Sequence, residues 1–217
     1  MRTVHPSRRR FAGRRFPRRR FAGIALAVLA VAPVAALAPP AQAFPKGDTI
    51  LAFAYKIRAT THIKKLNQTI SPPQGTFKGQ IDIEQQRLQG SINLPPVTFT
   101  LQEAGLPLVT ATARIVQAKP VTGTINLSTL RATATSTFNM LITSAEATGV
   151  PVNLVGSKCT TATPIVVTMS GKANLGGPSK FAGTFTIPPF KTCGAATLLL
   201  NQLIPGPGNT FSAVATP

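Results

Sequence analysis

Apolar and polar residues alternate along most of the sequence after residue 50, and this period of two is the pattern of strands with one buried face. It is clearest over residues 51–64, which predicts a long amphipathic first strand. The same alternation of apolar and polar residues, rich in Thr and Val, recurs at 77–84, 88–94, 97–101, 109–116, 121–127, 133–143, 165–173 and 181–187. Because Thr and Val suit pleated, half-buried surfaces, an all-β fold is predicted.

Helical periodicity is confined to residues 195–204, where a Leu-rich segment precedes the stop Pro205-Gly206-Pro207-Gly208. The chain has no Trp, and Tyr55 is its one Tyr, so the core is expected to be aliphatic and Phe-based. We expect a single domain over residues 44–217. Its form is either a sandwich or an open, curved, barrel-like sheet, with one short helix near the C-terminus.

The first 43 residues have the organisation of a signal peptide. Residues 2–20 hold nine arginines and no acidic residue, and residues 21–37 are mainly apolar. Ala41-Gln42-Ala43 is the pattern of small residues that a signal peptidase accepts, which places cleavage before Phe44.

Two further features bear on export. Pro33 interrupts the apolar run, which is also rich in Ala, and both features favour cleavage over a permanent membrane anchor. Arg8-Arg9-Arg10-Phe11 and Arg18-Arg19-Arg20-Phe21 match the twin-arginine pattern, but any basic signal peptide produces such matches by chance, so the Sec and Tat routes both stay open. We expect residues 44–217 to be secreted or held in the cell envelope, without a membrane span after cleavage.

The net charge of +18 would suggest a nucleic-acid partner, but nine of the basic residues lie in the signal peptide. Residues 44–217 keep 14 basic and five acidic residues, a net charge of +9. These charges are scattered rather than grouped with aromatic residues, so no nucleic-acid binding is expected. A moderately basic exported domain instead suits an anionic cell-wall polymer or lipid headgroups.

The two cysteines, Cys159 and Cys193, are an even count in an exported chain. This favours a structural disulfide over a metal site or reactive thiols. Turn residues flank both of them, so each backbone can adjust to the required separation. The bond would tether the strand-rich C-terminal part to the turn before the helix.

Several motifs of the C-terminal third are distinctive: Gly149-Val150-Pro151-Val152-Asn153-Leu154-Val155-Gly156, Cys159-Thr160-Thr161, Ile187-Pro188-Pro189-Phe190, Cys193-Gly194 and Gly206-Pro207-Gly208-Asn209-Thr210. With these motifs, the region 120–211 resembles a group of uncharacterised exported proteins of actinobacteria. The resemblance implies an exported compartment and a similar fold. It implies no site.

The inventory of catalytic groups after residue 43 is thin. His62 is the sole histidine, and no Gly-x-Ser-x-Gly motif presents a serine nucleophile. The best carboxylate pair is Asp82 with Glu84, which would lie about 7 Å apart on one strand face. Since Ile81 and Ile83 fill the opposite face, these acids are interpreted as the solvated side of an amphipathic strand. Metal ligands and a phosphate-binding glycine loop are also missing from the sequence, so neither an enzyme nor a cofactor is expected.

One cluster of basic residues carries a binding hypothesis: Lys56, Arg58, His62, Lys64 and Lys65. Four of the five alternate onto one face of the first strand, which predicts that they are exposed there while Phe53, Tyr55 and Ile57 are buried. This face would suit phosphates of wall polymers or lipids. Solvated strand surface, or an edge protected by lysine, is the competing interpretation.

Three kinds of function fit these features. The first is a non-enzymatic secreted or cell-envelope binding protein whose ligand the sequence does not identify. The second is a carrier of an apolar lipid or acyl ligand, because a curved sheet lined with Leu, Ile and Phe can enclose such a chain. The third is a structural surface-coat protein. An internal cavity would favour the carrier, and a solid core would count against it.

Overall fold

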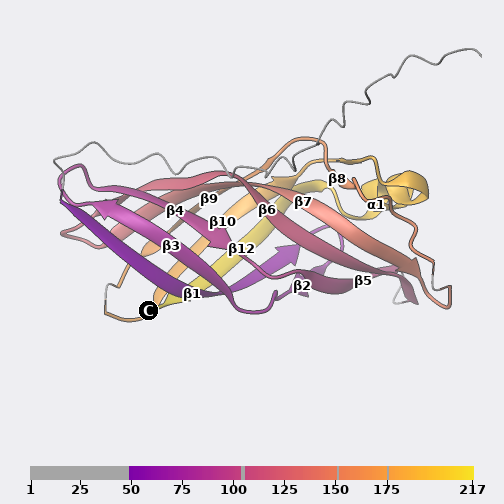
Figure 1. Cartoon of the computed structure of the whole chain (residues 1–217). Helices are drawn as coiled ribbons and strands as arrows, with labels where there is room; N and C mark the ends of the chain where they lie inside the picture. The colour runs from indigo at the N-terminus through magenta and orange to yellow at the C-terminus, as the bar shows by residue number, and fades with distance from the viewer. Residues whose placement is uncertain (1–48, 104–105, 151, 175) are drawn as a thin grey trace, which may run out of the picture. The chain divides into compact units, whose positions relative to one another are not determined.

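The structure is a computed structural model that describes residues 49–103, 106–150, 152–174 and 176–217. The predicted signal peptide, residues 1–43, lies outside the described residues. The all-β fold with one short helix near the C-terminus is confirmed (Figure 1). The strands are β1 (Ile50–Ile63), β2 (Gln68–Ile70), β3 (Gly75–Asp82), β4 (Arg87–Asn93), β5 (Val97–Glu103), β6 (Leu106–Asn126), β7 (Arg131–Ala147), β8 (Thr160–Thr161), β9 (Ile165–Lys172), β10 (Ser179–Ile187), β11 (Phe190–Lys191) and β12 (Gly206–Thr216).

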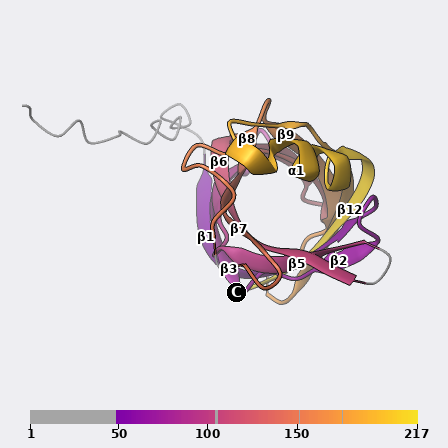
Figure 2. The ribbon, with the colours of Figure 1, turned by 90° about the vertical axis from the view of Figure 1, so that its right-hand side faces the viewer.

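Eight of these strands close into a ring. The hydrogen-bonded order is β7-β9-β10-β12-β1-β3-β4-β6, and β6 pairs with β7 to complete the circle. All these pairings are antiparallel. Figure 2, which looks along the described strands, shows them arranged around a common centre. The curved sheet expected from the sequence is therefore a closed barrel, in which each of the eight strands pairs on both sides over at least part of its length.

The alternation in β1 places the side chains around Ile57 as predicted. Ile57 is buried, whereas Lys56 and Arg58 on either side of it are exposed. Phe53 and Tyr55 share the inward face but are only half-buried, not buried as expected. The reason is that β12 ends opposite Lys56, so residues 50–55 pair with β3 alone and lack a neighbour on the other side.

The final strand, β12, was not expected from the sequence, where Pro205-Gly206-Pro207-Gly208 was interpreted only as the end of the helix. In the structure this segment leads directly into β12, which lies between β10 and β1. Asn209 anchors its start, because its side chain is buried and forms three hydrogen bonds. It accepts the N–H of Lys64 and donates to the carbonyls of Phe185 and Gly206.

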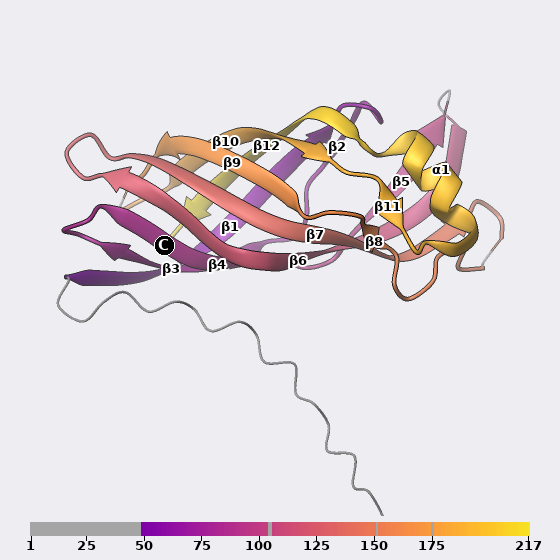
Figure 3. The same cartoon turned by 90° about the horizontal axis from the view of Figure 1, so that it is seen from above.

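The helical segment and the disulfide lie together near one end of the barrel. The helix predicted at 195–204 is present as the 3-10 turn η1 (Gly194–Ala196) followed by α1 (Thr197–Leu203), close to β8 and β11 (Figure 3). Leu200 and Ile204 are fully buried there. The predicted bond between Cys159 and Cys193 is confirmed, with a sulfur–sulfur distance of 1.98 Å. Within the described residues, no helix has the length and apolar character needed to cross a membrane.

Candidate functional site

The basic residues of the predicted anion-binding face are Lys56, Arg58, His62, Lys64 and Lys65. The four Lys and Arg side chains are exposed, but His62 is half-buried, with Nδ1 3.3 Å from the hydroxyl of Thr69. Lys64 and Lys65 lie in the turn after β1 rather than on its face, and Lys65 donates to the carbonyl of Asn201. The five residues therefore do not form one continuous stripe. Whether they bind anions stays a prediction.

The register of the barrel instead brings together basic residues that are far apart in the sequence. Arg131 lies opposite Lys172, which lies opposite Lys180. Lys180 and Arg58 both lie opposite Val214 on β12. Neighbouring strands are about 4.8 Å apart, so Lys172 faces Arg131 on one side and Lys180 on the other, whereas Val214 separates Lys180 from Arg58. We refer to Arg131, Lys172, Lys180 and Arg58 as the cation row. The sequence holds no local signal for it, since each member comes from a different strand.

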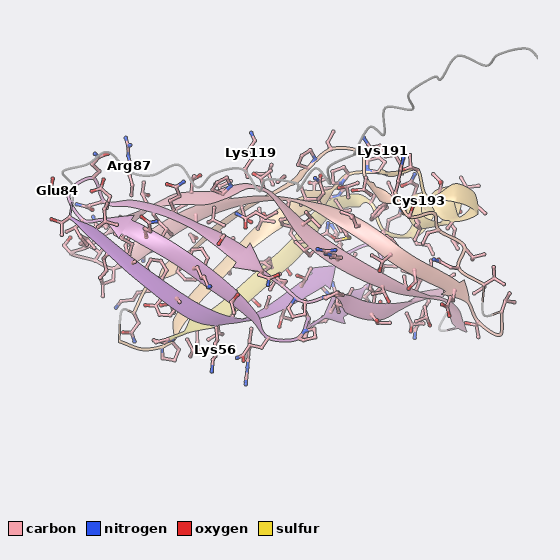
Figure 4. The ribbon with its side chains drawn as sticks, viewed as in Figure 1. Lys56, Glu84, Arg87, Lys119, Lys191 and Cys193 are labelled. Atoms are coloured by element: carbon pink, nitrogen blue, oxygen red, sulfur yellow. A yellow bond between two sulfur atoms is a disulfide. The ribbon has the colours of Figure 1, made fainter. Side chains whose placement is uncertain are left out.

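Other basic side chains also point away from the barrel, as Figure 4 shows for Lys56, Arg87 and Lys119. Among the acids whose burial is described, only Glu84 and Glu146 are exposed. Glu84 lies in the turn between β3 and β4, and Glu146 pairs with Thr110, so neither faces the cation row. The described outer wall is thus dominated by positive charge.

The carboxylate pair of the sequence analysis does not exist as predicted. β3 ends at Asp82, so Glu84 lies in the turn and the two acids do not share a strand face. Asp82 is also fully buried rather than solvated. Its Oδ1 accepts the backbone N–H of Gln85 at 2.8 Å, which assigns it a role in closing the turn. Its Oδ2 has no hydrogen-bond partner among the described residues.

A cavity of about 150 Å³ lies inside the barrel. Apart from Thr61, Gln117 and Ser136, its wall is apolar. The apolar wall residues are Ile57, Ala59, Ile63, Ile70, Pro72, Phe77, Leu88, Ile92, Leu94, Val97, Ala113, Ile115, Val121, Ala134, Phe138, Met140, Val167, Met169, Phe181, Phe185, Phe211, Ala213 and Ala215. Among the described residues of the wall, none is charged.

Small side chains explain why the barrel is hollow here. Ala59 on β1 lies opposite Ala213 on β12, and Ala134 lies opposite Gly123, so these inward positions contribute little volume. The buried residues separate into two groups as a result. Ile57, Ala59, Ala213 and Ala215 form a small cluster on the β1–β12 wall, apart from the main core. An eight-stranded barrel has an interior just large enough for side chains or for one small ligand, and small residues shift this one towards the second case.

The three polar side chains of the wall differ in their hydrogen bonding. Gln117 is satisfied, since its Oε1 accepts the N–H of Ile92 and its Nε2 donates to the carbonyls of Lys119 and Gly90. Ser136 is 5 % exposed, and its hydroxyl makes no hydrogen bond to any described residue. The Thr61 hydroxyl is likewise free of a partner in the described part of the chain.

The apolar, uncharged wall with its few polar side chains favours one kind of ligand. A charged group inside the cavity would have no counter-ion in the wall, and burying an unpaired charge is far more costly than burying an apolar group. A neutral, mainly apolar molecule with at most a few hydrogen-bonding atoms fits the wall. Sequence alternation identifies the inward residues, but it does not reveal that the small ones line the same cavity.

Within the described residues, no group of three or more His, Cys, Asp or Glu side chains is placed to hold a metal ion. No protein-family model, curated protein or solved structure matches the chain.

Proposed function

We propose that the protein is a non-enzymatic, extracytoplasmic binding protein that holds the apolar part of a lipid-like molecule inside its barrel. The observation that carries this proposal is the cavity, which is lined mainly by apolar side chains and has no charged side chain among its described wall residues. Ligand sites of this type are mostly apolar, with a few polar groups that fix orientation. Ser136 and Thr61 supply such groups here.

The size of the cavity limits how much of the ligand it takes. A cavity of about 150 Å³ lined by Leu, Ile and Phe accepts a molecule of roughly the size of benzene. About six carbon atoms of a chain therefore fit inside, and each buried methylene contributes about 0.8 kcal/mol. The rest of a longer acyl chain, together with any charged headgroup, must stay outside the cavity.

The secreted location in this proposal is supported by the predicted signal peptide and by the Cys159–Cys193 disulfide, which is typical of oxidising compartments. The resemblance of residues 120–211 to exported proteins of actinobacteria, noted from the sequence motifs, points to the same compartment. Mass spectrometry of lipids that co-purify with the native protein would identify the natural ligand.

A direct test measures binding of a neutral fluorescent probe, the methyl ester of a conjugated polyene fatty acid, whose emission rises in apolar surroundings. Ala134→Leu adds three carbon atoms to the cavity wall, and Thr133→Leu is its matched control on the outer face of the same strand. Displacing about three methylene groups of ligand should lower the affinity about fiftyfold, whereas the control should bind normally.

Ala213→Leu, with Ser212→Leu as its outward control, provides a second pair if Ala134→Leu fails to fold. Failure of the unaltered protein to bind the probe, or normal binding by both inward variants, would contradict the proposal.

The cation row supports a second candidate function, binding to an anionic polymer or membrane surface through the outer wall. Arg131, Lys172 and Lys180 on adjacent strands provide the positive charge. Retention on anionic vesicles or wall fragments that falls as salt rises, and that is lost in Lys172→Glu, would support it. Equal retention at low and high salt would rule it out.

A further inference from the structure

Two neighbouring strands of the described barrel wall, β3 and β4, lead into segments that diverge. Thr76 and Asn93 form a pair of the β3–β4 hairpin at this point. Beyond it, the chain on the β3 side leads back to β2, which pairs with β1 from Thr61 to Ile63. The chain on the β4 side leads forward to β5, which pairs with β6.

β2 and β5 are therefore neighbours without being partners. No pairing joins them among the described strands, and Figures 1 and 2 draw them close to one another. We call the gap between them the seam. Its borders are Ile70 and Pro72 on the β2 side and Leu94 and Val97 on the β5 side.

The segments at the fork are rich in proline. Ser71–Gln74 contains Pro72 and Pro73, and Leu94–Val97 contains Pro95 and Pro96. A proline has no backbone N–H, so it leaves no donor unsatisfied where a sheet stops pairing. The seam can remain open without a further strand to cover it.

The borders of the seam are also part of the cavity wall. Ile70, Pro72, Leu94 and Val97 all line the cavity, and each is half-exposed rather than buried. Apolar side chains that face the cavity and solvent at once are expected where a cavity opens. Leu94 lies against the start of β3, because a Cβ atom built on Gly75 would be 2.6 Å from its Cδ2.

Buried side chains lie near both ends of the barrel. Ile81 and Ile125 are buried near the turns after β3 and β6. Leu200 and Ile204 are buried at the end that carries α1. Passage between any two paired strands would break ladder hydrogen bonds in an apolar setting, whereas passage through the seam breaks none.

We infer that the ligand enters and leaves sideways through the seam between β2 and β5, with the Leu94 side chain as the movable part of the opening. This inference rests on the proposed function. The apolar end of the ligand lies in the cavity, and the remaining chain and headgroup lie in the seam and beyond it. A chain longer than about six carbon atoms has to be placed in this way, since the cavity has room for no more.

Stopped-flow fluorescence with the polyene methyl ester tests the route. Leu94→Ala widens the seam and Leu94→Trp narrows it. Asn93→Ala, one residue earlier and exposed, is the matched control. A residue that merely touches the bound ligand changes the dissociation rate constant, so the association rate constant is the diagnostic quantity. We expect it to rise about tenfold in Leu94→Ala, to fall about tenfold in Leu94→Trp and to stay unchanged in the control.

Two variants test the ends of the barrel. Tyr55→Ala removes a half-buried side chain beside the point where β12 ends. Leu203→Ala weakens the packing of α1 at the other end. Both should leave the association rate constant unchanged. An unchanged rate constant in both Leu94 variants, or a response to an end variant in their place, overturns the route while leaving binding intact. Failure of the unaltered protein to bind the ester overturns the proposed function and the route together.

Discussion

The side-chain oxygen of Asn209 accepts a hydrogen bond from the backbone N–H of Lys64, 145 positions earlier in the chain. The same side chain donates to the carbonyls of Phe185 and Gly206, so one amide links β12 to β10 and to the turn after β1. It is 1 % exposed, so water does not replace these bonds when the side chain is removed.

We therefore expect Asn209→Ala to lower the free energy of unfolding by about 2–4 kcal/mol, because it leaves several buried polar groups unsatisfied. The matched control is Asn126→Ala. The Asn126 side chain also accepts hydrogen bonds, from the N–H groups of Ser128 and Thr129, but it is exposed. Urea unfolding measures both losses, and similar losses would contradict the assignment.

The disulfide should contribute strongly to stability. Cys159 and Cys193 are 34 positions apart, and closing a loop of this length stabilises a fold by about 4 kcal/mol in the chain-entropy model. The double Cys→Ser variant should therefore unfold at lower urea concentration. Denatured, unreduced protein should show no reactive thiols. Two thiols per chain would refute the bond, and an unchanged unfolding midpoint would refute its contribution to stability.

Gly171 lies where two strands approach closely. A Cβ atom there would lie 1.9 Å from the backbone carbonyl oxygen of Lys180. Because a backbone atom cannot move aside as a flexible side chain can, Gly171→Ala should lower the free energy of unfolding by about 3 kcal/mol. Gly176→Ala is the control, since a Cβ atom at that position meets no atom within 4 Å. Equal melting temperatures for the two variants would contradict the close approach.

The cation row should destabilise the barrel slightly. Lys172 lies between Arg131 and Lys180, so Lys172→Glu converts two like-charge pairs into two opposite-charge pairs. The variant should unfold at higher urea concentration than the unaltered protein at about 20 mM salt, and the difference should shrink at about 1 M salt, where charges are screened beyond about 3 Å. Lys191→Glu, opposite Thr160, should show no such gain.

Much of the fold follows from local pattern. The alternation in 51–64 predicts β1 and its buried Ile57, and the Leu-rich segment before Pro205 predicts α1. β12 was missed because its inward residues include Ala213 and Ala215, whose small side chains give a weak alternation. The strands predicted at 109–116 and 121–127 are one strand, β6, because register shifts at Gln117 and Lys119 carry the pairing through the irregular segment between them.

The candidate site was less accessible from the sequence. An apolar lining was expected for a carrier, but the cavity depends on Ala59, Ala134 and Ala213 facing the same space. The cation row depends on pairing among β7, β9 and β10. Both are properties of register, which joins residues that no local window contains. The burial of Asp82 was missed for a related reason, since it depends on where β3 ends.

The position of β12 has a consequence for folding order. Lys56 and Thr216 lie opposite each other but are 160 positions apart, so closing the ring requires one of the longest-range pairings in the chain. Such pairings form slowly, because the entropy of a long loop is lost before the contacts are gained. The β6–β7 hairpin can form as soon as its own residues are available. Until residues 206–216 dock, however, β1 and β10 each expose an edge and the cavity lacks one wall. On the proposed function, ligand retention therefore begins only when β12 is in place.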